Sequence, residues 1–79
     1  MPTAYILINY DIGKKKNEQD AINRLKNVPG VVEANLVNGV YDIVVKITSD
    51  ALDSLKETIT RDIRTIDIIR STMTLILIE

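Results

Sequence analysis

Two residue types that carry much of protein chemistry are missing from this 79-residue chain, which contains neither cysteine nor histidine. Without cysteine there are no disulfides, no thiolate nucleophiles and no thiolate metal ligands. Without histidine the commonest metal ligand and general base is missing as well. We therefore expect no catalytic site, no metal site and no cofactor, and we expect that the protein is not an enzyme.

Long apolar runs and an excess of positive charge are also absent. No segment approaches the roughly 18 to 20 apolar residues of a membrane helix, and the N-terminus lacks the pattern of a secretory signal. Ten Lys and Arg residues stand against eleven Asp and Glu residues, so the net charge is -1 and offers little counterion release on a nucleic acid. These features predict a soluble cytoplasmic protein that binds neither membranes nor DNA directly. The basic run at 14–16 is interpreted as a solvated loop.

Apolar residues make up 46% of the chain and fall in short periodic segments, which is the composition of one folded domain over residues 1–79. In the segment 3–10, one face carries Ala4, Ile6 and Ile8 and the other carries Tyr5 and Leu7. Apolar side chains on both faces predict a strand at the centre of a sheet.

Two helices are indicated by apolar residues at spacings of three and four. The first is expected to be capped by Asn17 and to end before Pro29 and Gly30. Its apolar stripe consists of Ala21, Ile22, Leu25 and Val28. The second is expected to be capped by Ser49, with Glu57 and Arg61 as an i,i+4 ion pair. Its apolar stripe consists of Leu52, Leu55, Ile59, Ile63 and Ile66.

Three more strands complete the pattern. In the second strand Val32, Ala34 and Leu36 alternate with polar residues, and Asn38 with Gly39 predicts a tight hairpin turn. The third strand is expected to run over 40–48. Its core face is expected to carry Tyr41, Ile43, Val45 and Ile47. The last strand is expected over 68–78, where β-branched residues are frequent.

The resulting order, β-α-β-β-α-β, is the ferredoxin-like split motif of the α+β class. Right-handed crossovers place both helices on one face of a four-stranded antiparallel sheet. The opposite face then carries Val44, Tyr5, Leu7 and one row of the last strand, an apolar patch that a small domain gains from covering. We expect self-association through this face, whereas the simpler interpretation is scattered surface hydrophobes.

Polar residues interrupt the apolar strands at two places. Asp42 stands at the hairpin, and Thr72 and Thr74 share one face of the last strand. A carboxylate that pairs with an ammonium group, together with hydroxyl groups that bind a carboxylate, would suit an α-amino acid. The alternative interpretation is structural: Asp42 bonds the hairpin backbone, and threonines are simply good strand formers.

Four elements of the sequence form a pattern together: Val28-Pro29-Gly30-Val31-Val32-Glu33-Ala34, Asn38-Gly39-Val40-Tyr41-Asp42-Ile43-Val44-Val45, Leu55 with its helix, and Ser71-Thr72-Met73-Thr74-Leu75-Ile76-Leu77. This pattern resembles the ligand-binding domain of the leucine-responsive and asparagine-regulator (Lrp/AsnC) transcription factors, also called RAM. That family carries a helix-turn-helix domain ahead of this one. Because residue 3 already opens the first strand, this chain is similar to a stand-alone RAM protein.

The resemblance implies a ferredoxin-like fold, homodimers that pair their sheet faces, and often rings of such dimers that hold an amino acid effector between dimers. It also implies assembly with full-length Lrp/AsnC regulators and hence an indirect role in transcription. Carried over residue by residue, it makes Gly39, Tyr41, Asp42, Thr72 and Thr74 the ligand-binding candidates. Where the family usually has a Gly-Val pair, this chain has Ile68-Ile69.

Three other functions compete with effector binding. A ligand-free oligomerisation module would need only the apolar face. An acylphosphatase-like hydrolase would need an anion-binding loop with an arginine after the first strand, and this loop contains lysines instead. An RNA-binding sheet would need aromatic platforms on its central strands, and the only aromatic residues are Tyr5, Tyr10 and Tyr41.

Overall fold

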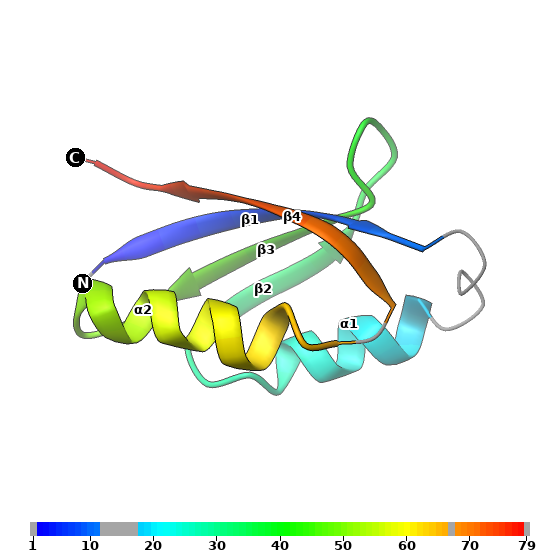
Figure 1. Cartoon of the computed structure of the whole chain (residues 1–79). Helices are drawn as coiled ribbons and strands as arrows, with labels where there is room; N and C mark the ends of the chain where they lie inside the picture. Colours follow the sequence, from blue (N-terminus) through cyan, green and yellow to red (C-terminus); the bar gives the residue numbers. More distant parts are fainter. Residues whose placement is uncertain (1, 12–17, 67, 79) are drawn as a thin grey trace.

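The computed structural model describes residues 2–11, 18–66 and 68–78, and it confirms the predicted order of elements (Figure 1). The elements are β1 (Thr3–Tyr10), α1 (Glu18–Lys26), β2 (Val31–Leu36), β3 (Ile43–Thr48), α2 (Leu52–Thr58) and β4 (Ile69–Ile76). A π-helical segment, η2 (Ile59–Ile63), continues α2. The strand order is β2-β3-β1-β4, and every neighbouring pair is antiparallel. Both helices lie on one face of this sheet, which is the predicted ferredoxin-like arrangement.

The core lies between the sheet and the two helices. It contains the predicted face of β1, three residues of β3, the apolar stripe of α1, and the stripe of the second helix except Leu52. Its largest fully buried side chains are Ile6, Ile8, Leu25, Ile43, Ile47, Leu55, Ile63, Ile68 and Val45. Since β1 pairs with β3 on one side and β4 on the other, the predicted central position of the first strand is confirmed. In the described part of the chain no helix is long and apolar enough to cross a membrane.

The turn from α1 into β2 depends on one glycine. Gly30 adopts a φ of 93°, and a Cβ atom built at this position would collide with the carbonyl oxygen of Thr48. The backbone N–H of Thr48 donates to the carbonyl of Gly30 at 2.9 Å. Glycine is needed here both for its positive φ and for the close approach of β3.

The expected cap Asn17 and the basic run at 14–16 lie outside the described residues.

The second strand departs from its predicted alternation. Val32 is 57% exposed and Leu36 is also exposed, so only Ala34 of the three alternating apolar residues is buried. The register with β3 shifts between Val31 and Glu33, and Val31 packs against the core instead. A bulge in an edge strand inserts one residue that breaks the alternation of side chains between the two faces of the sheet. A prediction that assumes a strict period of two cannot locate such a bulge.

The hairpin between β2 and β3 is wider than expected. Neither Asn38 nor Gly39 has a positive φ, and β3 begins at Ile43 rather than at Val40. The connection closes where the Val37 N–H donates to the Asp42 carbonyl at 2.9 Å. The predicted tight turn is therefore wrong, and so is the core position of Tyr41, because the side-chain alternation of β3 does not extend through the loop that precedes it.

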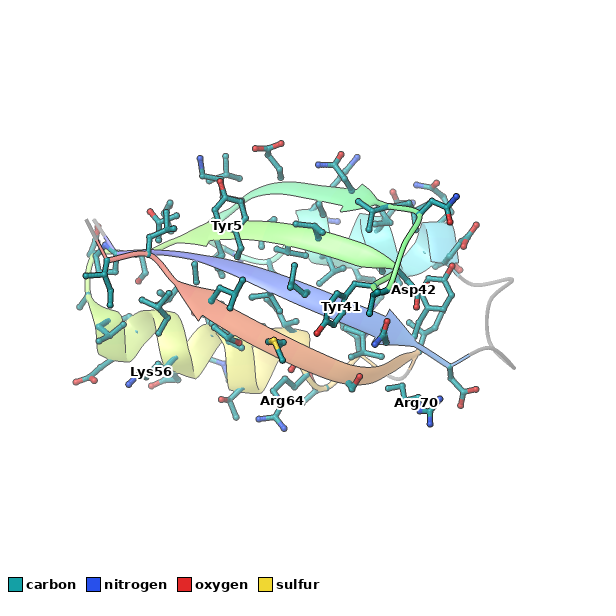
Figure 2. All side chains as sticks on the ribbon, turned by 90° about the horizontal axis from the view of Figure 1, so that it is seen from above. Tyr5, Tyr41, Asp42, Lys56, Arg64 and Arg70 are labelled. Atoms are coloured by element: carbon teal, nitrogen blue, oxygen red, sulfur yellow. The ribbon has the colours of Figure 1, made fainter. Side chains whose placement is uncertain are left out.

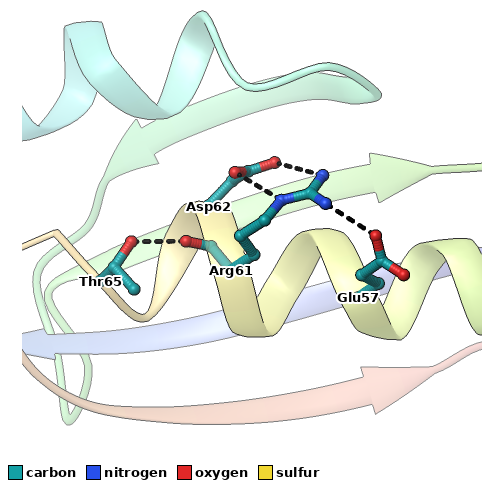
Figure 3. Close-up of polar contacts among 4 residues, drawn as sticks. All are labelled: Glu57, Arg61, Asp62 and Thr65. Carbon is teal, nitrogen blue, oxygen red and sulfur yellow. Dashed lines mark hydrogen bonds and ion pairs between the residues drawn. The ribbon is translucent and has the colours of Figure 1, made fainter.

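The second helix begins later than predicted. Ser49 does not cap it. Instead Ala51 stands at the cap position without a side-chain hydrogen bond, and α2 starts at Leu52. Leu52 is 41% exposed, whereas the rest of the predicted stripe, Leu55, Ile59, Ile63 and Ile66, is buried. The predicted pair of Glu57 and Arg61 is confirmed at 2.7 Å (Figure 3).

Candidate functional site

The sheet face opposite the helices is exposed and largely apolar, as predicted (Figure 2). Within the ladder, Leu7 lies between Val44 and Met73, and Tyr5 lies beside Leu75. We call Tyr5, Leu7, Val44, Met73, Leu75 and Leu77 the open face. Met73 and Leu75 are 49% and 48% exposed, so the apolar surface is concentrated along β4.

Tyr41 extends this surface from the hairpin. Its hydroxyl group lies 3.6 Å from the sulfur of Met73, so the ring lies over the open face instead of the core (Figure 2). On the same face the ammonium group of Lys46 lies 6.0 Å from the centroid of the Tyr5 ring. This separation is within the range of a weak cation–π contact. Two of the three tyrosines thus belong to the open face.

Asp42 stands at the edge of a polar surface cavity of about 580 Å³. The residues that line it, which we call the Asp42 cavity, are Asn9, Tyr10, Val40, Asp42, Arg70 and Ser71. One carboxylate oxygen of Asp42 accepts the Tyr10 N–H at 3.2 Å, and the Asp42 N–H donates to the Ile8 carbonyl at 2.9 Å. Asp42 is therefore held against the end of β1, while the other carboxylate oxygen has no hydrogen bond within the described part of the chain.

Arg70 gives the Asp42 cavity a charge of the opposite sign. It lines the same cavity, and among the described residues it forms no ion pair. The cavity can thus contact an ammonium group through Asp42 and a carboxylate through Arg70. Arg70 was not among the site residues predicted from the sequence.

The Asp42 cavity is bounded by a tyrosine that stays protonated to high pH. The Tyr10 hydroxyl group donates to Glu18 at 2.6 Å. This hydrogen bond, burial of the ring and the negative charges of Glu18 and Asp42 raise the pKa of Tyr10 to about 12. Tyr10 is therefore a neutral donor, and it contributes no negative charge to the cavity at neutral pH.

Thr72 and Thr74 lie in a different depression, on the helix side of β4. They pair with Ile8 and Ile6, two core-facing residues, so their side chains point toward α2 and η2. A groove of about 400 Å³ runs between these elements. We call it the threonine groove, and its lining residues are Lys56, Ile59, Thr60, Arg64, Thr72, Thr74 and Ile76.

One chain does not bring the five predicted ligand-binding residues together. Tyr41 lies on the open face, Asp42 lines its own cavity, and Thr72 and Thr74 line the threonine groove. Gly39 is in open space, since a Cβ atom there would meet nothing within 4 Å. Lys56 and Arg64 were not predicted, although their spacing from Thr60, four residues on either side, places all three on one helix face.

Comparisons with known proteins agree on one family. The family model described as the Lrp/AsnC ligand binding domain matches residues 3–79. Regulatory protein AsnC of Escherichia coli (strain K12) is 31% identical over 80 residues, a match that covers 91% of this chain and 53% of that protein. The chain thus spans about half the length of the curated relatives that it matches.

Solved structures give the same result. A hypothetical protein from Pyrococcus horikoshii, PHS023, has 39% sequence identity and a TM-score of 0.87 over 100% of this chain and 92% of its own. The structure of E. coli AsnC has 31% identity and a TM-score of 0.87 over 99% of this chain and 51% of its own. The similarity therefore extends over the whole described fold.

Proposed function

Because the chain belongs to the Lrp/AsnC ligand binding domain family of transcriptional regulators, we propose that it binds a free α-amino acid and that binding changes its assembly. The assembly is with further copies of itself or with full-length regulators of the same family. Gly39, Tyr41, Asp42, Thr72 and Thr74 are the proposed effector-binding residues. The observation that carries the proposal is the fixed position of Asp42 in a cavity that Arg70 also lines, where one of its carboxylate oxygens accepts no hydrogen bond from the described residues.

The separation of the proposed residues supports a site that is shared between copies. The threonine groove contains hydroxyl and cationic groups but no carboxylate, so it cannot neutralise the ammonium group of an amino acid. Asp42 can do this, but in the same chain it lines a different cavity. If Asp42 of one copy meets the threonine groove of another, the ammonium and carboxylate groups of the effector are both bound. Such a site is incomplete in one chain.

Self-association through the open face is the second part of the proposal. The row of half-exposed side chains on β4, next to Tyr5 and Leu7 of β1, forms a continuous apolar surface on a domain of only 79 residues. Small domains gain stability when such a surface is covered. Two copies that pair these faces would bury it and leave the threonine groove, on the helix side of β4, accessible on the outside.

The effector would act through differential affinity for two assembly states. A ligand shifts an equilibrium only as far as it binds one state more tightly, typically by about 1 to 3 kcal/mol in allosteric proteins. An effector bound between copies meets this requirement, because a dissociated copy supplies only half of its contacts. Ligand binding and assembly are then linked reciprocally, and each strengthens the other.

Thermal unfolding of the purified protein with each of the twenty amino acids tests this function. An effector at 100 times its Kd should stabilise the protein by about 2.7 kcal/mol. Asp42→Asn should abolish the effect, because an amide cannot pair with an ammonium group, and Asp53→Asn on α2 is the matched control. If no amino acid stabilises the protein, the ligand-free oligomerisation module is the better function. If Asp42→Asn binds as tightly as the unmodified protein, the assignment of Asp42 is wrong.

A further inference from the structure

The threonine groove carries more positive charge than a neutral amino acid requires. Lys56 and Arg64 line it from the helix side, and no carboxylate is among its lining residues. The Asp42 cavity adds Arg70 and the single carboxylate of Asp42. The two half-sites therefore present three cations and one carboxylate to a ligand that lies between copies.

The two cations of the groove are not used elsewhere in the described structure. Arg61, on the same helix, is held by Glu57 at 2.7 Å and by Asp62 at 3.2 Å (Figure 3). By contrast, neither Lys56 nor Arg64 has an ion-pair partner among residues 2–11, 18–66 and 68–78. Glu57 and Asp62 thus pair with Arg61, while the groove cations have no ion-pair partner among the described residues and are available to a ligand.

The opposite wall of the groove also favours a carboxylate. The Leu77 N–H donates to the Thr3 carbonyl, so the alternation of the antiparallel ladder turns the backbone groups of Thr72 and Thr74 away from β1. They point outward along the free edge of β4, beside their own hydroxyl groups. Hydroxyl and N–H donors next to a cation form the charge-assisted hydrogen bonds that carboxylates accept.

The positions of the two cations fit a ligand with two carboxylates. Lys56 lies in α2 and Arg64 directly follows η2, with Thr60 between them, and both line the groove. One cation can therefore bind an α-carboxylate while the other binds a second carboxylate farther along the groove. The groove volume of about 400 Å³ is within the range of small-molecule sites.

Resting on the proposed function, we infer that the effector is an acidic amino acid, of the aspartate or glutamate class. Its ammonium group pairs with Asp42 of one copy, and its two carboxylates pair with Lys56, Arg64, Thr72 and Thr74 of the other. An acidic amino acid lowers the excess positive charge of the combined site, a neutral one leaves it unchanged, and a basic one raises it. Of Lys56 and Arg64, the one that binds the second carboxylate then selects the side-chain charge of the effector.

Matched pairs of ligands test the inference. The dissociation constants of aspartate and asparagine, and of glutamate and glutamine, are measured by calorimetry at constant ionic strength on the unmodified protein. Each pair differs in charge but hardly in shape. The acid should bind at least about tenfold more tightly than its amide in one pair, the size expected for one charge-assisted contact. Of the variants Arg64→Gln and Lys56→Gln, the one that removes the partner of the side-chain carboxylate should reduce this preference and leave the affinity for the amide nearly unchanged. The other removes the partner of the α-carboxylate and should weaken the binding of acid and amide alike.

Arg61→Gln is the control, since Arg61 is on the same helix but does not line the groove; it should keep the preference intact. If an amino acid binds but the amide binds as well as the acid, the inference is wrong and the proposed function stands. If the acid is preferred and neither groove variant changes the preference, the threonine groove does not select the side-chain charge of the ligand, and the inference is again wrong. If no amino acid binds at all, the proposed function fails and the inference fails with it.

Discussion

The hydroxyl group of Tyr10 donates a 2.6 Å hydrogen bond to Glu18, which joins the end of β1 to the first turn of α1. The interaction favours the protonated tyrosine, and it raises the pKa of Tyr10 from 10.0 to about 12. Because the pKa is higher in the folded than in the unfolded state, the contribution to stability is complete below pH 10. It is lost as the pH rises toward 12.

Tyr10→Phe should therefore destabilise the protein at pH 8, by about 1.5 kcal/mol if the hydrogen bond behaves like others to charged groups. The free energy of unfolding, measured by urea denaturation at pH 8 and at pH 11, should fall with pH less steeply in the variant than in the unmodified protein. Tyr5→Phe is the control, because the Tyr5 hydroxyl forms no hydrogen bond with the described residues. Equal pH slopes for Tyr10→Phe and the unmodified protein would contradict the assignment.

Substitution by alanine should destabilise the protein at one glycine and have little effect at another. Gly30→Ala places a Cβ atom against the Thr48 carbonyl at a φ of 93°, so the free energy of unfolding should fall by more than about 1 kcal/mol. Gly39→Ala meets open space at an ordinary φ, so its effect should stay within about 0.5 kcal/mol. Thermal or urea unfolding of the two variants checks the contrast, and similar losses in both would show that the backbone at residue 30 is not constrained.

A charge placed on the open face should dissociate the assembly. Leu75→Glu introduces a carboxylate beside Tyr5 in the middle of the surface that we expect to pair with another copy. The mass measured by light scattering after gel filtration should fall toward that of one chain. Leu52→Glu alters a similarly exposed leucine on the helix side and should leave the mass unchanged. An unchanged mass for a folded Leu75→Glu variant would argue for assembly through another surface.

Most of the fold is predictable from the sequence because burial imposes a period on each segment. Ala4, Ile6 and Ile8 face the core because this part of the central strand β1 pairs with both neighbours without a register shift. Where only one side of a strand is bonded, as in β2, the register can shift, and Val32 leaves the core. The predicted turn of the hairpin was wrong for a related reason. Asn38 and Gly39 allow a tight turn, but the structure has a wider loop, which ends where Asp42 contacts β1.

The candidate site was less predictable, since it depends on which elements become neighbours. Asp42 and the two threonines stand out as polar residues within apolar strands, so the sequence reveals them singly. Their separation into two depressions follows from the direction in which Thr72 and Thr74 point from an edge strand. Arg64 has no local signal of its own, because an exposed arginine on a helix is ordinary until β4 is known to lie beside it.

The register shift between Val31 and Glu33 also protects an edge of the sheet. Free edge strands offer unpaired backbone groups to other chains and are common starting points for fibrous aggregation. In β2 the bulge breaks the regular spacing of these groups, and a charged Glu33 is exposed next to it. An incoming strand would lose hydrogen bonds at the bulge and desolvate a carboxylate. The irregularity that removes Val32 from the core thus also makes the β2 edge a poor template for an added strand.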